Sequence, residues 1–209
     1  MPMKVNEREY RDFTLAVVNL EDQEEERKIV SGYASVFNTP YTLFEDDELV
    51  IQEQVSDKAF ENADITDVIF QYNHEGRVFA RVSNGTLKVV PDDKGLSIEA
   101  DLGGTDIGNQ LYQEIKGGYT TKMSYGYTVD GADWTESRLD DGRILELRTV
   151  TSVSKVYDVS AVSIPANNAT SISVRNLSDG VIEQVRAERL KALELERRKL
   201  QMKLKAGGF

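Results

Sequence analysis

The sequence contains no cysteine and a single histidine, His74. The lack of cysteine excludes disulfides, thiolate nucleophiles and cysteine-rich metal sites. With one imidazole in the chain, any serine-based catalysis that needs a histidine has one possible base. The chemistry of this protein is therefore narrowed to a few classes before any motif is considered.

Long apolar runs and an excess of positive charge are also missing. No stretch approaches the ~20 apolar residues of a membrane span, and the N-terminus lacks the apolar core of a signal peptide. We therefore expect an intracellular protein without a membrane partner. The net charge of −11 argues against a broad nucleic-acid surface on the main domain, because phosphate binding depends on clustered Lys and Arg. A length of 209 residues fits one compact domain plus an appendage.

Short segments in which apolar residues recur at every second position dominate the sequence. From Leu96 to Leu102 apolar and polar residues alternate strictly, which is typical of a half-buried antiparallel strand. Residues 28–37 are apolar on both sides, as in a strand buried on both faces. Glycine-containing turns at 84–85 and 93–95 favour hairpins between neighbouring strands. Further strands are predicted at 13–20, 49–54, 68–72, 78–82, 86–90, 121–129, 144–150 and 154–164.

Two short helices are expected among these strands. Ser56 can cap a helix over 57–62, and Thr105 or Asp106 can cap a second helix that ends at Gly117. Many antiparallel strands with few helices predict a mainly β protein, organised as a barrel or a sandwich.

The character of the chain changes after Arg175. A turn-like segment, 176–180, leads into residues 181–205, which contain no Gly or Pro and are rich in strong helix formers. From Arg186 onward this segment holds eight Lys or Arg against three Glu. A basic helix is therefore predicted to follow an acidic domain.

Ser124 is a candidate nucleophile because of its position in a predicted strand. Met123 and Tyr125 would point to the core, while Ser124 and Gly126 would point to the other face, where Gly126 leaves open space. A small hydroxyl beside an open site is what an incoming carbonyl requires. From spacing alone, however, an ordinary surface serine and a structural histidine are the more common cases.

Asp158 is a candidate third member of such a site. An acid within a strand rich in Val and Ala is costly to bury unless it is hydrogen-bonded, and an imidazole N–H would satisfy it. The alternative is an edge-strand aspartate that faces water. The residues by themselves leave both interpretations open.

The sequence resembles the prohead maturation proteases of tailed phages, the family typified by the HK97 prohead protease. The resemblance rests on an ordered set of segments that spans about residues 28–175. These are Ser-Gly-Tyr-Ala-Ser-Val-Phe (31–37), Asn-His (73–74), Ser-Asn-Gly-Thr-Leu (83–87), Asp-Lys-Gly-Leu-Ser-Ile-Glu-Ala-Asp-Leu (93–102), the segment 117–127 with Met-Ser-Tyr-Gly-Tyr, and Val-Tyr-Asp-Val-Ser-Ala-Val-Ser-Ile-Pro-Ala (156–166).

The resemblance implies a closed, mostly antiparallel β-barrel of the herpesvirus-protease (assemblin) type. Short helices would flank this barrel, and a helix would extend it at the C-terminus, so the class is mainly β with few helices (α+β). The implied domains are an N-terminal segment, 1–27, that could add a strand, a serine protease domain, 28–175, and a linker with the basic helix, 176–209.

The resemblance also implies an activity and a setting. The protein would be a serine endopeptidase that cleaves the scaffolding region of the major capsid protein, and itself, inside the immature prohead in the bacterial host cytoplasm. His74, Ser124 and Asp158 match the family positions of the base, the nucleophile and the third residue. Self-association as a dimer or larger assembly is expected, with no cofactor, metal or nucleic acid.

The oxyanion of the reaction would need preorganised donors. The assemblin-like arrangement implies a backbone N–H from the loop after the third catalytic residue. Pro165 has no N–H, so Ala166 or Asn167 is the candidate donor.

Two other classes compete with this interpretation. A catalytically inactive barrel could act as a capsid scaffold or interaction protein, although such a relative would have no physical reason to keep His74, Ser124 and Asp158 together. A metal-dependent hydrolase is disfavoured by the single histidine and by the lack of an HExxH-like spacing. The basic helix could pair with an acidic scaffold or coat helix, remain solvated, or form a dimerisation coil.

Overall fold

The computed structural model describes residues 8–14, 27–163, 185–192, 194–195 and 198–199. The chain divides into two compact units, Met1–Ser171 and Ile172–Phe209. The described residues of the first unit form two β-sheets and one α-helix. Those of the second unit are helical, as predicted for this part of 181–205. No helix among the described residues is long and apolar enough to cross a membrane.

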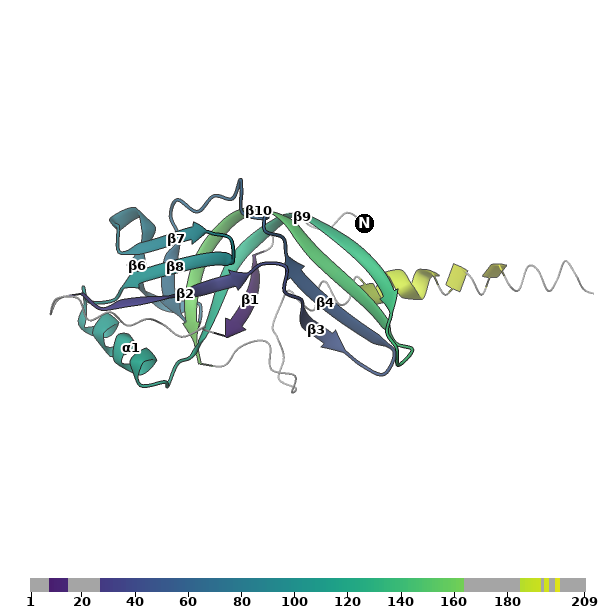
Figure 1. The fold of residues 1–209 in the computed structure, drawn as a ribbon, viewed down its shortest axis with the longest axis horizontal. Coiled ribbons are helices and arrows are strands. Elements are labelled where there is room, and N and C mark those ends of the chain that lie inside the picture. Colours follow the sequence, from purple (N-terminus) through teal and green to yellow (C-terminus); the bar gives the residue numbers. More distant parts are fainter. Residues whose placement is uncertain (1–7, 15–26, 164–184, 193, 196–197, 200–209) are drawn as a thin grey trace, which may run out of the picture. The chain divides into compact units, whose positions relative to one another are not determined.

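The larger sheet is built around a long antiparallel hairpin of β9 (Lys122–Arg138) and β10 (Ile144–Val162), which are prominent in Figure 1. Its main path runs β1-β9-β10-β4-β3, and β5 and β6 extend it beside the other end of β10. The remaining strands of this sheet are β1 (Glu9–Thr14), β3 (Tyr41–Glu45), β4 (Leu49–Val55), β5 (Ile69–Tyr72) and β6 (Glu75–Arg81).

The smaller sheet has the order β2-β8-β7 and is antiparallel throughout. Its strands are β2 (Ile29–Val36), β7 (Leu87–Pro91) and β8 (Gly95–Asp101). In β8 the apolar residues Leu96, Ile98 and Ala100 are buried and the polar residues between them are more exposed, which confirms the predicted alternation. The turn before β8 is closed by Asp92, whose Oδ1 accepts hydrogen bonds from two backbone N–H groups.

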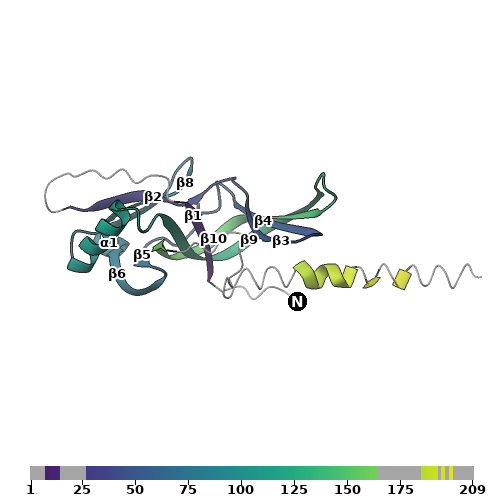
Figure 2. The same ribbon diagram turned by 90° about the horizontal axis from the view of Figure 1, so that it is seen from below.

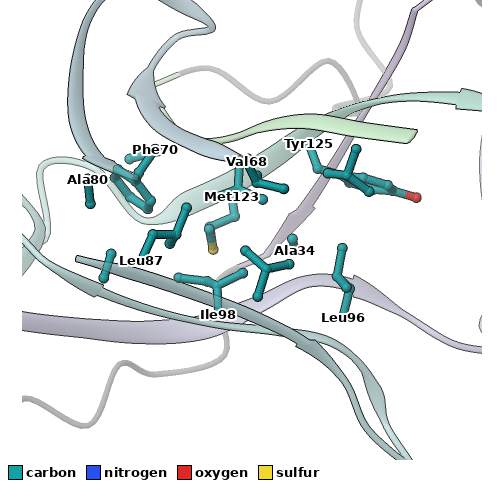
Figure 3. Packing of buried hydrophobic residues seen from close by; sticks show 14 of the residues in the cluster. Ala34, Val68, Phe70, Ala80, Leu87, Leu96, Ile98, Met123 and Tyr125 are labelled. Atoms are coloured by element: carbon teal, nitrogen blue, oxygen red, sulfur yellow. The ribbon is translucent and has the colours of Figure 1, made fainter. Parts of the chain in front are cut away.

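The hydrophobic core lies between the two sheets. Figure 3 shows Ile98 and Leu96 of the smaller sheet pointing toward the larger sheet, with Ile98 below Met123 and Leu96 below Tyr125 of β9. Tyr125 and Tyr127 of β9 are fully buried, and their rings stack with centroids 4.4 Å apart. Burial of one face of β9 leaves its opposite face for other contacts.

One of the two predicted short helices is confirmed. The helix α1 (Asp106–Lys116) begins after Thr105, whose Oγ1 accepts a hydrogen bond from Gly108 N. The chain leaves this helix through Gly117 and Gly118, and Gly118 has a φ of +74°. Figure 2 shows this helix from the second direction.

The predicted helix over 57–62 is wrong, because this segment is a series of turns. Ser56 Oγ does accept from Lys58 N at 3.3 Å, as a cap would. However, the carbonyl of Ala59 accepts the backbone N–H of Val153 in β10, at 2.8 Å. A tertiary bond therefore takes an acceptor that a continuing helix would use.

The predicted closed, mostly antiparallel barrel is also wrong, although the α+β class holds. The larger sheet is mixed, because β10 pairs in parallel with both β4 and β5. The strands form two open sheets, joined at an isolated parallel bridge between Phe37 and Val55. The long β9–β10 hairpin explains the difference. β4 and β5 pair with different stretches of the same edge of β10, the edge that does not face β9.

Other strand predictions were incomplete. β3 was not predicted, and β10 replaces two predicted strands, 144–150 and 154–164. The predicted strand 13–20 overlaps the end of β1, which begins at Glu9, and its remainder lies outside the described residues.

Candidate active site

His74 occupies a two-residue turn between β5 and β6. Asn73 and His74 both have positive φ, 51° and 59°, which a type I′ hairpin turn requires. Asn and His adopt this conformation more readily than most residues. The Asn73 N–H donates to the carbonyl of Ala161, and Asn73 Oδ1 accepts from Ser163 N at 3.0 Å. These bonds fix the turn to the end of β10, so His74 is held beside that strand.

Ser124 lies in the middle of the larger sheet, on β9. It stands opposite Ser160 of β10, and its neighbours Met123 and Tyr125 are in the core, as the alternation predicted. The residue is completely buried. The interpretation of Ser124 as a surface serine is therefore wrong.

A β-bulge in β10 places the side chain of Asp158 on the same face of the larger sheet as Ser124. Val156 stands opposite Tyr127 and faces the core, whereas Asp158 stands opposite Gly126, so the strand carries one extra residue, Tyr157, between them. This extra residue turns the Asp158 side chain to the face of Ser124. β10 is paired on both sides here and Asp158 is 1 % exposed, so the edge-strand interpretation is wrong.

The three side chains form one chain of hydrogen bonds. His74 Nε2 lies 2.6 Å from Ser124 Oγ, and His74 Nδ1 bonds to Asp158 Oδ1. An ionised carboxylate can only accept, so Nδ1 carries the proton and Nε2 of the neutral ring accepts from the serine hydroxyl. This tautomer is the one that a general base requires.

Two further residues contact Asp158, and sequence reasoning missed both. Ser160 is fully buried, and its Oγ donates to Asp158 Oδ1 at 3.0 Å. Arg8 Nη1 lies 3.6 Å from Oδ2, and its guanidinium stacks 4.0 Å from the ring centroid of Tyr157. Asp158 Oδ2 has no hydrogen-bond partner among the described residues. The two-residue spacing from Asp158 could have indicated Ser160, but no local pattern indicated Arg8.

The predicted oxyanion donors Ala166 and Asn167 lie outside the described residues. Over the part of the chain that the structure describes, no group of three or more His, Asp or Glu side chains is arranged to hold a metal ion.

A cluster of buried charges, which includes two residues of β1, is formed by Glu9, Arg11, Glu53 and Arg148. Arg148 Nη2 is 2.9 Å from Glu9 Oε1, Arg11 Nη2 is 2.7 Å from Glu9 Oε2, and Arg11 Nη2 is 3.0 Å from Glu53 Oε2. The hydroxyl of Tyr127 donates to Glu53 at 3.3 Å, which places the cluster on the face of β9 opposite Ser124. Sequence reasoning did not predict this cluster.

The charges of the cluster stabilise one another. Burial alone would raise the pKa of Glu53, but the guanidinium groups of Arg11 and Arg148 outweigh burial and lower that pKa to about 2. Burial likewise opposes the charge of Arg148, yet Glu9 and Glu53 raise its pKa well above the ordinary value. Glu53 and Arg148 are therefore charged at neutral pH.

In the comparison with protein families, the family model described as caudovirus prohead serine protease matches residues 15–184. Comparisons with curated proteins and with solved structures find no significant match. The matched region contains His74, Ser124 and Asp158, and it begins after the last residue of β1.

Proposed function

The chain belongs to the caudovirus prohead serine protease family, and from this premise we propose that Ser124 is its nucleophile, His74 its general base and Asp158 the acid that orients the base. The observation that carries this proposal is the hydrogen-bond chain from Ser124 Oγ through both ring nitrogens of His74 to Asp158 Oδ1. The sequence offers no second imidazole for that role.

The proposed mechanism is acyl transfer. His74 Nε2 takes the proton of Ser124 as Oγ attacks the scissile carbonyl, and the tetrahedral intermediate collapses as His74 returns the proton to the leaving amine. Water, activated by the same imidazole, then hydrolyses the acyl-enzyme. Asp158 holds the Nδ1–H tautomer and stabilises the imidazolium that forms during each step.

The family is one of prohead proteases, so the proposed substrate is a capsid protein. We infer that the enzyme removes the scaffolding region of the major capsid protein, and cuts itself, inside the immature prohead in the host cytoplasm. Self-association and the oxyanion donors Ala166 and Asn167 belong to the same proposal. An inactive scaffold or interaction protein is the competing function.

Labelling with a fluorophosphonate probe distinguishes a serine protease from an inactive scaffold. The protein would be treated both as purified and as recovered from assembled proheads, and the modified residue would be mapped by peptide mass spectrometry. We expect modification of Ser124 that is lost in His74→Ala, whereas Ser97, a serine on the other sheet, stays unmodified. Absence of modification in both preparations would favour the scaffold.

A further inference from the structure

The first described strand, β1, covers one edge of the strand that carries Ser124. The order β1-β9-β10 leaves β9 with two neighbours, and β1 pairs with it over Lys122–Tyr127, with Asp12 opposite Ser124. Release of β1 would leave the outward backbone N–H and C=O groups of this stretch without partners. Such an open edge next to a nucleophile can accept another extended segment.

Buried charges contribute to holding β1 against β4 and β10 of the larger sheet. It contacts the charge cluster through one acid and one base, Glu9 and Arg11, which are both buried. Glu9 bonds to Arg148, and Arg11 bonds to Glu53. If β1 leaves, it removes one negative and one positive charge, and Arg148 and Glu53 remain paired with each other. Release therefore leaves no uncompensated buried charge, which is the usual large cost of breaking a buried ion pair.

The opposite face of β1 meets the candidate active site. Arg8, the residue before the strand, brings its guanidinium to within 3.6 Å of Asp158 Oδ2. Ser124 is completely buried while β1 is in place. The described strand also precedes the region that matches the family, residues 15–184. These observations place β1 beside a nucleophile that a substrate has to reach.

We propose that β1 is a resident strand that blocks the peptide-binding edge of β9, and that this edge binds extended peptides with an acidic residue followed two positions later by a basic one. The pattern follows from the partners that β1 would vacate: Arg148 would donate to the acidic residue, and Glu53 would accept from the basic one, on one face of the incoming strand. This inference rests on the proposed function for its catalytic meaning, but the docking itself does not require catalysis.

The test uses the full chain in a Ser124→Ala background, so that binding is measured without cleavage. Glu9→Lys with Arg11→Glu sets like charges against Arg148 and Glu53 while the net charge stays the same. The matched control is Lys88→Glu with Glu99→Lys, which exchanges an exposed pair on the smaller sheet. Hydrogen exchange of the amides in 122–127 and binding of a fluorescent peptide of residues 8–14 are the two measurements.

We expect the exchanged β1 variant to show at least tenfold faster hydrogen exchange at the β1-facing amides of 122–127, and addition of the 8–14 peptide to restore their protection. The peptide should bind this variant at least tenfold more tightly than it binds the parent or the control. A peptide with its acidic and basic positions exchanged should bind at least tenfold more weakly. Unchanged protection in a folded variant, or equal binding of the two peptides, would overturn the proposal.

A second experiment applies if the exchanged β1 variant does not fold. A cleavage sequence for an added protease, inserted between Thr14 and Arg27, leaves β1 and its partners unaltered, and cutting it makes β1 an exchangeable peptide. Replacement of β1 by the labelled peptide supports the proposal, and retention of β1 against excess labelled peptide overturns it.

The catalytic consequence is measured separately, with Ser124 intact. Fluorophosphonate should modify Ser124 at least tenfold faster after release of β1, and equal rates before and after release would overturn the blocking role. If the peptide docks as expected while neither form is modified, the docking site stands and the proposed function fails.

Discussion

Ser160 is a second residue, besides His74, that bonds to the carboxylate of Asp158. Its hydroxyl donates to the same oxygen, Oδ1, that His74 Nδ1 contacts, and it is buried on a strand paired on both sides. A hydrogen bond to a charged group contributes about 1.5–3 kcal/mol. We therefore assign Ser160 to positioning of the carboxylate, without contact to the reacting atoms.

Ser160→Ala should lower kcat by about tenfold and leave KM unchanged, because it removes one bond that orients the carboxylate and no contact to a substrate. Ser160→Thr, which keeps the hydroxyl, should restore most of the rate. Asp158→Asn should be slower than either, because an amide favours the wrong imidazole tautomer. Turnover of a peptide spanning the mapped cleavage site measures all three, and a wild-type kcat for Ser160→Ala would contradict the assignment.

His74 has the backbone conformation of a glycine. Its φ of 59° lies in the left-handed region, where a residue with a Cβ is strained by roughly 1–2 kcal/mol. We interpret this strain as the cost of placing an imidazole at the tip of a tight hairpin, next to Asp158.

Two substitutions of His74 should therefore differ in stability while both are inactive. His74→Gly should be more stable than His74→Ala by about 1 kcal/mol, because only glycine adopts positive φ without steric cost. Both lose the same hydrogen bonds, so the comparison isolates the backbone. Urea unfolding of the pair provides the measurement, and equal free energies of unfolding would argue against strain at this turn.

Local sequence patterns indicated the candidate site residues, but not the bulge and the long-range contacts that position them. The alternation around Ser124 predicted the face on which its side chain lies, because the side-chain period of a strand is fixed. The position of Asp158 depends on the bulge at Tyr157, which reverses the alternation and cannot be found from spacing. Arg8 meets Asp158 across 150 residues of sequence, so no local pattern could have paired them.

At the scale of the elements, β1, β4 and β10 are joined by the buried charges of Glu9, Arg11, Glu53 and Arg148. The alternation of Glu9 and Arg11 on β1 directs both to the same side. In the sequence these residues are separated by up to 139 positions, and each by itself indicates an exposed strand residue. Burial of the whole set is a property of the sheet order and was not predictable from composition.

The cluster should make the fold sensitive to acid. The pKa of Glu53 is lowered in the folded state, to about 2, so its contribution is complete above the ordinary value of 4.5 and is lost as pH falls from 4.5 toward 2. For this one group the loss is on the order of 3 kcal/mol. Urea unfolding at several pH values, compared with Glu53→Gln, should give a smaller dependence on pH in the variant. Equal slopes would contradict the assignment.

β10 shows why element boundaries were harder to predict than element types. Its alternation is interrupted by register shifts between Val150 and Lys155, so the sequence pattern divides it into two strands. Hydrogen bonding continues through these shifts because β9 follows the same path. The open, mixed arrangement depends on this continuity. The residue pattern predicted a barrel or a sandwich, and the choice of a closed barrel came from the family resemblance.

The whole chain divides into an acidic β unit and a second unit, Ile172–Phe209, whose described residues are helical, and we assign the two units separate roles. The candidate site lies entirely in the first unit, and the basic residues predicted to contact an acidic scaffold lie in the second. Delivery and catalysis should therefore be separable.

Truncation after Asn176 should retain modification of Ser124 by a fluorophosphonate and prevent incorporation into proheads. Full-length protein should bind scaffold less tightly as salt is added, because attraction between exposed charges is screened. Proheads assembled with each chain, analysed by gel and mass spectrometry, provide the comparison. Packaging of the truncated chain as efficiently as the full chain would refute the targeting role, and loss of modification in the truncated chain would instead assign the helix to activation.

The most direct test of the proposed protease is the mass of the coat protein after co-expression with this chain. Wild type should yield a coat protein shortened at a defined position, and Ser124→Ala and His74→Ala should each leave it at full length, because no second imidazole can replace His74. Complete processing by His74→Ala would contradict the account.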